Sequence, residues 1–313
     1  MKFPRLSRWL LSVLIIAITS LAILGGQVSS QAQSPLSLDS AGLTLEKVGD
    51  GIYSLIADVD FPPEDPQRAI CNGSIIIGDD GVLIIDPFQS PELANLMLAT
   101  AKELTDQPVR YVLNTHFHFD HTGGNSAIAA QKIPIIGRGE IRNLMLTKNT
   151  ERDPNLTPPT MIFENNGSMW LGKREVRLEK AEGHTIGSDI VVYVPDAKVL
   201  ITGDILFNQR FPFINDGNLR QWQKTLDDLS DRYQDVTVVP GHGPITNTQG
   251  LANLKEYLDN LETLALSWKE KFLTQEQAIN SASEIPASYQ DFKFKAFYSS
   301  NLETAYQQIT QGK

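Results

Sequence analysis

The sequence predicts an α/β fold in which two mixed β-sheets pack together and helices cover them. Two observations lead to this prediction. In each half of the chain, short apolar runs typical of strands are followed by segments with helical spacing. Within each half, neighbouring runs are joined by short turn sequences that are typical of antiparallel hairpins. The composition is that of a globular chain, because 41% of the 313 residues are hydrophobic and 20% are charged.

The first half of the chain begins with strand-type segments. The sequence Gly78-Asp79-Asp80-Gly81 separates two apolar runs and indicates a hairpin. Pro91 opens a segment whose apolar residues recur at helical spacing. Strands are expected at Leu43–Val48, Gly51–Ala57, Ser74–Ile77, Val82–Ile85, Val109–Leu113 and Ile133–Ile136. Helices are expected at Pro91–Leu104, Ala127–Gln131 and Glu140–Lys148.

The second half repeats this order of strands and helices. Gly172-Lys173 and Pro195-Asp196 each separate two strand-type runs and indicate hairpins. Strands are expected at Ser168–Leu171, Glu175–Lys180, Asp189–Val194, Val199–Thr202 and Val236–Val239. Helices are expected at Leu219–Tyr233 and Gln249–Phe272, with one or two more after Ile285.

The N-terminus is expected to lie outside this fold. Residues 1–32 resemble a signal peptide, with basic residues first, the apolar run Trp9–Leu24 next, and the small residues of Ser30-Gln31-Ala32 at the end. The alternative is an uncleaved membrane anchor. Residues 33–42 are expected to form a flexible leader, and residues 43–313 the folded domain including the C-terminal helices. We therefore expect a periplasmic or secreted protein.

Charge and cysteine content exclude several classes of protein. The net charge of −10 makes the chain a poor general binder of nucleic acid, and a small-molecule partner is expected instead. No membrane contact is expected beyond the N-terminal segment, and the sequence does not indicate an oligomeric state. Cys71 is the single cysteine, so neither an intramolecular disulfide nor a cysteine-rich metal site can form. The simplest role for Cys71 is that of a small buried residue.

The histidines indicate a metal site. Three of the five lie in the stretch His116-Phe117-His118-Phe119-Asp120-His121, directly after the strand expected at Val109–Leu113. In an extended chain, His116, His118 and Asp120 would share one face, and Asp120 and His121 would point in different directions. Imidazoles and carboxylates are ligands for zinc and similar ions, and this pattern suits two neighbouring metals. The alternative is a histidine cluster with only a structural role.

The motif His-x-His-x-Asp-His resembles the signature of the metallo-β-lactamase superfamily. Four further segments resemble the motifs of that family, in the same order along the chain. The early and late motifs are Leu83-Ile84-Ile85-Asp86, Gly183-His184-Thr185-Ile186-Gly187-Ser188, Thr202-Gly203-Asp204 and Pro240-Gly241-His242-Gly243-Pro244. The resemblance spans most of residues 43–245 and implies a four-layer αββα sandwich of two mixed β-sheets, with the site at one edge.

The resemblance also implies a ligand set for two divalent metal ions. Zn²⁺ is expected, with iron or manganese as alternatives. The ligands of the first metal would be His116, His118 and His184, those of the second metal would be Asp120, His121 and His242, and Asp204 would bridge the two. Asp120 would also be catalytic, because it could orient the attacking hydroxide or take its proton. Asp86 would either fix an imidazole ring of this set through its N–H or only cap a turn.

Two segments are candidates for substrate contact. Phe207, Arg210 and Phe211 follow the Asp204 motif, where the family places residues over the metals. Arg210 could bind a carboxylate and the two phenylalanines could line an apolar wall, or the segment could be a core-anchored loop with a solvated arginine. The irregular loop Asp58–Arg68 either borders the site or is an inert surface loop.

The resemblance implies an exported hydrolase that uses two zinc ions and a metal-bound hydroxide to cleave a carbonyl-centred bond in a small molecule. The bond could be a thioester, ester, lactone or β-lactam, and a true β-lactamase is one alternative. A second alternative is an iron-dependent persulfide dioxygenase with one metal, although the complete second ligand set argues against it. A third is a protein with a vestigial site, but no ligand of the set is missing.

Overall fold

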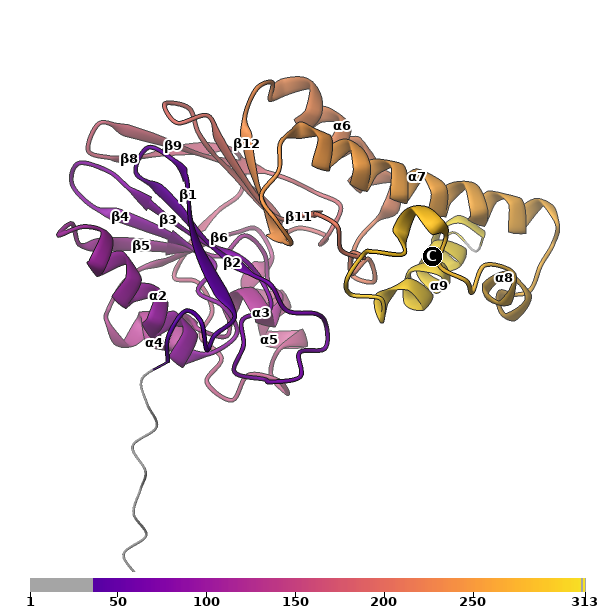
Figure 1. Cartoon of the computed structure of the whole chain (residues 1–313), viewed down its shortest axis with the longest axis horizontal. Helices are drawn as coiled ribbons and strands as arrows, with labels where there is room; N and C mark the ends of the chain where they lie inside the picture. The colour runs from indigo at the N-terminus through magenta and orange to yellow at the C-terminus, as the bar shows by residue number, and fades with distance from the viewer. Residues whose placement is uncertain (1–35, 311, 313) are drawn as a thin grey trace, which may run out of the picture. The chain divides into compact units, whose positions relative to one another are not determined.

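Two mixed β-sheets form the centre of the computed structural model of the chain, which describes residues 36–310 and Gly312 (Figure 1). The expected signal peptide, residues 1–32, lies outside the described residues. The expected leader lies partly outside them. Its described part, residues 36–42, contains a turn in which the Ser37 and Ser40 hydroxyls hydrogen-bond at 3.0 Å and Ala41 is fully buried.

The first sheet has seven strands in the order β1-β2-β3-β4-β5-β6-β7. The strands from β1 to β4 pair antiparallel, and the strands from β4 to β7 pair parallel. The parallel strands bring their carboxyl ends to one edge of the sheet. The bounds are β1 Leu43–Gly49, β2 Ile52–Ala57, β3 Gly73–Ile77, β4 Val82–Ile85, β5 Val109–Leu113, β6 Ile135–Arg138 and β7 Met161–Phe163.

The second sheet has five strands in the order β12-β11-β10-β9-β8. Only β11 and β12 pair parallel in this sheet, and the other neighbours are antiparallel. The bounds are β8 Gly167–Leu171, β9 Arg174–Lys180, β10 Ile190–Val194, β11 Val199–Phe207 and β12 Thr237–His242.

Alternating side chains bury both faces of the first sheet. Leu83 and Ile85 of β4 face a core shared with the second sheet, which contributes Val192 and Val199. Ile84 points to the opposite face, because successive side chains of a strand alternate. This pattern of two buried faces explains why the expected strand Val82–Ile85 is an unbroken apolar run.

Helices cover the outer face of each sheet. On the first sheet, Leu93 and Met97 of α2 (Pro91–Leu104) pack with α4 (Asn125–Ala130), and Ser90 caps α2 by accepting from the Leu93 amide. On the second sheet lie α6 (Leu219–Arg232) and α7 (Thr248–Glu270), which pack on Val191 and Leu200. Figure 1 shows these layers. The αββα sandwich that the sequence predicts is confirmed.

The C-terminal segment packs against α7. It contains α8 (Gln275–Ser281), the short 3₁₀ helix η1 (Ala287–Tyr289) and α9 (Phe297–Thr310), and its buried side chains join the core of α6 and α7. A Thr274–Gln277 capping box begins α8. No helix within the described residues is long and apolar enough to cross a membrane.

Four local features differ from the sequence prediction. The strand expected at Val199–Thr202 continues to Phe207, and the sequence analysis did not predict β7. The chain after His118 is not extended, because Phe119–Thr122 form the short helix α3. The helix expected at Glu140–Lys148 is α5, Ile141–Lys148.

Candidate metal centre

The seven candidate ligands come together at one edge of the two sheets. His116 and His118 follow β5, and Asp120 and His121 lie on α3. The remaining ligands come from the second sheet: His184 follows β9, Asp204 lies within β11, and His242 ends β12. Gly203 has φ +50°, and a Cβ there would lie 2.5 Å from Thr115 Oγ1, so this position of β11 requires glycine.

The first group of ligand atoms contains three imidazoles and Asp204. His118 Nδ1 lies 3.0 Å from His116 Nε2 and 3.1 Å from His184 Nε2. Asp204 Oδ2 lies 3.6 Å from His116 Nε2 and 3.4 Å from His184 Nε2. All four ligand atoms lie within 4.8 Å of one another, so one ion could bind all of them.

The second group shares Asp204 with the first. Asp204 Oδ1 lies 3.1 Å from His121 Nε2, and Asp204 Oδ2 lies 3.2 Å from His242 Nε2. Asp120 Oδ2 lies 3.5 Å from His121 Nε2 and 3.3 Å from His242 Nε2. The structure therefore brings together the second set of ligands that the sequence analysis named, with Asp204 between the two groups.

Cys71 lies beside the second group. The Cys71 thiol is fully buried, as the sequence analysis expected, and it donates to the Asp120 carbonyl at 3.0 Å. Its sulfur, a carboxylate oxygen of Asp120 and a ring nitrogen of His121 lie within 4.8 Å of one another. Burial raises the pKa of Cys71 to about 12, so without a metal the thiol is protonated. The sequence analysis did not predict that Cys71 lies beside the candidate ligands.

Asp86 connects the two groups to the strand ends. One carboxylate oxygen accepts from the Thr115 amide at 2.8 Å. The other accepts from the Thr115 hydroxyl at 2.7 Å and lies 2.8 Å from His121 Nδ1. The Thr115 hydroxyl in turn lies 3.1 Å from His116 Nδ1. Asp86 therefore orients His121 directly and His116 through Thr115, as expected for a residue that fixes metal ligands.

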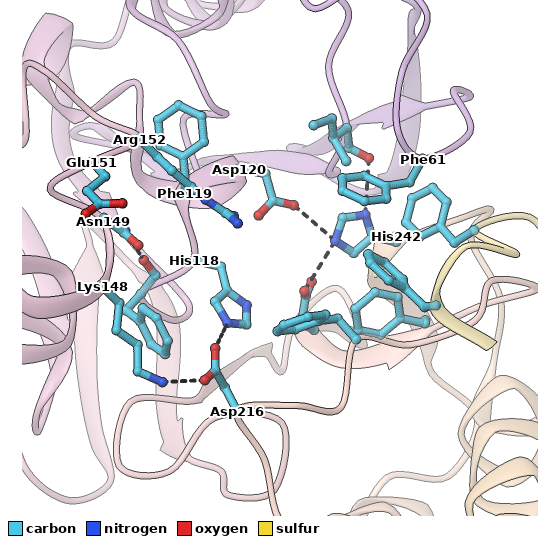
Figure 2. Close-up of a pocket in the computed structure, with 17 residues that line it drawn as sticks. Phe61, His118, Phe119, Asp120, Lys148, Asn149, Glu151, Arg152, Asp216 and His242 are labelled. Carbon is cyan, nitrogen blue, oxygen red and sulfur yellow. Dashed lines mark hydrogen bonds and ion pairs between the residues drawn. The ribbon is translucent and has the colours of Figure 1, made fainter. Parts of the chain in front are cut away.

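Asp216 plays the same part for His118, and the sequence analysis did not identify it. Its carboxylate lies 3.0 Å from His118 Nε2 and is also paired with Lys148 (Figure 2). Asp216 lies in the loop between β11 and α6, and Lys148 ends α5. Because the three residues are far apart in sequence, only the folded chain reveals this chain of contacts.

Burial and neighbouring charge shift the pKa values of His116, His184 and Asp204 toward the forms that bind a metal. Burial lowers the pKa of His184 to about 3 and holds the pKa of His116 well below its ordinary value. Burial would raise the pKa of Asp204, but the charges of the surrounding imidazoles outweigh it and hold that pKa well below the carboxyl range. The pKa of His242 is instead raised to about 9, because the carboxylates of Asp204 and Asp120 outweigh burial. A bound metal would displace that proton, because neutral imidazole is the form that coordinates a metal.

The donor set fits a metal. His121 Nε2 and Asp204 Oδ1 are both buried, and neither has a hydrogen-bond partner within the described residues, although they lie 3.1 Å apart. Buried polar atoms without a partner are rare and call for an explanation, and a bound cation supplies one. Their chemistry, imidazole and carboxylate, is that of divalent zinc and iron sites.

A cavity of about 500 Å³ opens beside the ligands. Phe207 is one of the residues that line it, and its ring stacks on His242 with centroids 4.7 Å apart. Phe211 is fully buried against Tyr257 and Tyr298 and does not line the cavity. Arg210 does not line it either, because its guanidinium turns toward Asp58, 3.7 Å away. The loop Asp58–Arg68 borders the cavity through Phe61.

The chain belongs to the metallo-beta-lactamase superfamily. The model of that family matches residues 67–242, which is more than half of the chain and includes all seven candidate ligands. The fold and the arrangement of the ligands agree with this assignment. Members of the superfamily include hydrolases that bind divalent metals.

Individual relatives have different activities. The chain is 30% identical over 153 residues to a hydroxyacylglutathione hydrolase of Rhodospirillum rubrum, covering 49% of this chain and 55% of that protein. The chain therefore spans about half the length of this relative. Among solved structures, a metallo-beta-lactamase from Pontibacter korlensis matches with a TM-score of 0.60 and 23% identity, covering 70% of this chain and 99% of that one. An inverting sec-alkylsulfatase from Pseudomonas sp. matches with a TM-score of 0.67 and 20% identity, covering 85% of this chain and 50% of that one.

Proposed function

We propose that this metal-dependent hydrolase is exported, uses two zinc ions, and cleaves a thioester, ester, lactone or β-lactam of a small molecule. The single observation that carries the proposal is the pair of ligand groups that share Asp204. The hydroxyacylglutathione hydrolase relative supports hydrolysis of an acyl compound. The signal-like residues 1–32 support export.

Each ligand group would hold one ion. His116, His118 and His184 would hold the first ion, and His121, His242 and Asp120 the second, with Asp204 between them. Bound divalent ions would polarise the scissile carbonyl and lower the pKa of a nearby water molecule. Asp86 and Asp216 would keep the imidazoles in place by accepting their second N–H groups.

Asp120 is the residue suited to handle the water proton. Its carboxylate lines the cavity, and its side chain is 22% exposed while the neighbouring ligand His121 is fully buried. Asp120 can therefore reach a water molecule in the cavity, orient it, and accept one proton. Hydrolysis adds the water oxygen to the acyl carbon and breaks its bond to the leaving oxygen, sulfur or nitrogen. Asp120 then returns the proton to the leaving atom.

The test is hydrolysis by zinc-loaded protein of representative thioesters, esters, lactones and β-lactams. We expect turnover of at least one class, and loss of that turnover in Asp120→Ala by a factor of about 10² or more. The variant should keep the wild-type circular dichroism spectrum and hold less zinc. Full activity in Asp120→Ala would contradict the proposed role of Asp120. Absence of turnover in all four classes by zinc-loaded protein would contradict the proposed function.

A further inference from the structure

Four phenylalanines form one wall of the cavity, which we call the aromatic wall: Phe61, Phe213, Phe294 and Phe297. They come from three separate segments of the chain. Phe61 stacks on Phe297 with ring centroids 4.7 Å apart, and Phe213 meets Phe297 at 5.5 Å. Phe294 lies 5.9 Å from both Phe61 and Phe297. The rings therefore form one continuous apolar surface.

The aromatic wall begins at the ligands themselves. The ring of Phe213 lies 5.4 Å from the ring of His118, and the ring of Phe294 lies 5.2 Å from that of His242. One wall residue thus contacts each ligand group. A substrate whose reacting carbonyl lies between the two groups would have its substituent beside the wall.

Outside the metal ligands, the described cavity lining carries two carboxylates, of Glu151 and Asp216, and two cations. Its two cations are Lys148 and Arg152. Lys148 is ion-paired with Asp216, and Arg152 has the acidic Glu151 as its sequence neighbour in the same lining (Figure 2). An anionic group on the substrate would have to compete with Asp216 for Lys148 and would lie near the Glu151 carboxylate, so charge favours a neutral substrate.

The wall is held in place before any substrate binds. Lys293 Nζ lies 2.6 Å from Asp58 Oδ1, and the Phe294 amide donates to Asp60 at 2.7 Å. The Arg210 guanidinium lies 3.7 Å from Asp58 and 5.7 Å from the centroid of the Phe294 ring. These contacts join the loop after β2 to the segment before α9. A wall that is already ordered loses little conformational entropy when a ligand packs on it.

We infer that the aromatic wall binds the apolar acyl chain of a neutral thioester or ester, and that the enzyme prefers medium-chain acyl groups to acetyl. This inference rests on the proposed hydrolase function. The cavity of about 500 Å³ lies within the usual range of small-molecule sites and has room for such a chain. Burial of each additional methylene against the rings favours the longer substrate.

The experiment compares acetyl and octanoyl thioesters of N-acetylcysteamine, which share one small leaving thiol that a thiol reagent detects. We expect kcat/KM to be about 100-fold higher for the octanoyl thioester, because a single methylene in an apolar pocket can change kcat/KM by about tenfold. Phe297→Ala should lower this octanoyl-to-acetyl ratio about tenfold, and Phe61→Ala, from another segment, should act in the same direction. Phe297→Leu should keep most of the ratio.

The matched control is Phe272→Ala, since Phe272 is 93% exposed in the turn that follows α7. It should leave the ratio unchanged. A wild-type ratio near one, with both thioesters hydrolysed, would overturn the inference and leave the proposed function standing. The inference would also be overturned if both wall variants, shown to be folded by circular dichroism, kept the wild-type ratio.

A binding measurement separates the two proposals if no thioester is hydrolysed. In that case the proposed function fails for this substrate class, and calorimetry with zinc-loaded protein compares octanoate and acetate as ligands. Octanoate binding at least tenfold tighter than acetate, and weakened in Phe297→Ala but not in Phe272→Ala, would support the wall as an acyl-chain site. Equal affinities would overturn it.

Discussion

Asp86 illustrates how one buried residue organises a metal centre. Its side chain is almost fully buried and accepts two hydrogen bonds from Thr115 while contacting His121 Nδ1. A carboxylate has acceptor capacity on both oxygens, whereas an amide has only one accepting atom. The sequence analysis left open whether Asp86 fixes an imidazole or caps a turn, and in the structure it contacts both the imidazole and the backbone.

Asp86→Asn should therefore weaken metal binding without removing a ligand. The amide nitrogen would face either the Thr115 backbone N–H or both the Thr115 hydroxyl and His121, so at least one present contact is lost. We expect zinc affinity to fall by about 10- to 100-fold, and the free energy of unfolding to fall by about 1–3 kcal/mol. Competition with a zinc chelator and urea unfolding measure the two effects. Asp80→Asn, in the exposed β3–β4 turn, is the control, and equal zinc affinity in both variants would contradict the role of Asp86.

Asp189 should make stability depend on pH. It is buried and accepts from the Thr185 amide at 2.7 Å, and burial raises its pKa to about 8 from an ordinary value of 3.8. Between pH 4 and 8 the folded state therefore binds a proton that the unfolded state has released, so this contribution to the free energy of unfolding falls as pH rises.

Asp189→Asn removes that contribution, because the amide does not titrate. The free energy of unfolding of the variant minus that of wild type should therefore be larger at pH 8 than at pH 5. Urea unfolding of both proteins at the two pH values measures this change, and Asp235→Asn, whose side chain is 90% exposed in the wild type, is the control. Parallel pH profiles for wild type and Asp189→Asn would refute the assignment.

At the scale of elements, the backbone of β12 approaches β11 closely beside the ligands, and this close approach fixes the position of Asp204. A Cβ at Gly241, near the end of β12, would lie 2.0 Å from Asp204 Oδ1 and 2.7 Å from the Gly203 carbonyl carbon. Gly241→Ala must therefore displace the carboxylate that the two ligand groups share. We expect a loss of at least about tenfold in zinc affinity and in turnover.

The control for Gly241→Ala is Gly167→Ala in β8, where a Cβ would have no neighbour within 4 Å. That variant should keep its zinc affinity and turnover. Zinc titration and steady-state kinetics measure both. If Gly241→Ala also kept its zinc affinity and turnover, metal binding would not depend on the present position of the Asp204 carboxylate.

The elements and the ligands differ in how far the sequence predicts them. Strands buried on both faces, such as β4, are apolar runs and were predicted, whereas β7 has only three residues and no alternating pattern. The candidate ligands were found because each lies in a short local motif. Asp216, Cys71 and the aromatic wall were not found, because they approach the ligands only through contacts between distant segments. For the same reason Phe211 was placed beside the substrate, although it packs in the core.

At the scale of the whole molecule, the centre joins the two sheets. His116 and His121 follow β5 of the first sheet, and Asp204 and His242 belong to the second. Metal ions bound between them would bind the folded state and not a separated pair of sheets, so they add to stability by mass action.

Removal of metal should therefore lower the thermal midpoint of the entire domain. With zinc at 100 times its dissociation constant, the stabilisation is about 2.7 kcal/mol for one site. For a domain of this size we expect a fall in Tm of several degrees on chelation, reversed by added zinc. Differential scanning calorimetry with and without a chelator measures it. An unchanged Tm, with the metal shown to be absent, would mean that the ions do not hold the sheets together.

The central proposal is that the two ligand groups would hold two metal ions, with Asp204 available to both, and elemental analysis of the purified protein tests it most directly. Protein prepared without added metal, or reconstituted and desalted, is measured for zinc, iron and manganese per chain. We predict close to two zinc ions per chain, falling toward one in Asp120→Ala. One iron per chain with little zinc, or no retained metal after addition of zinc, would contradict the account.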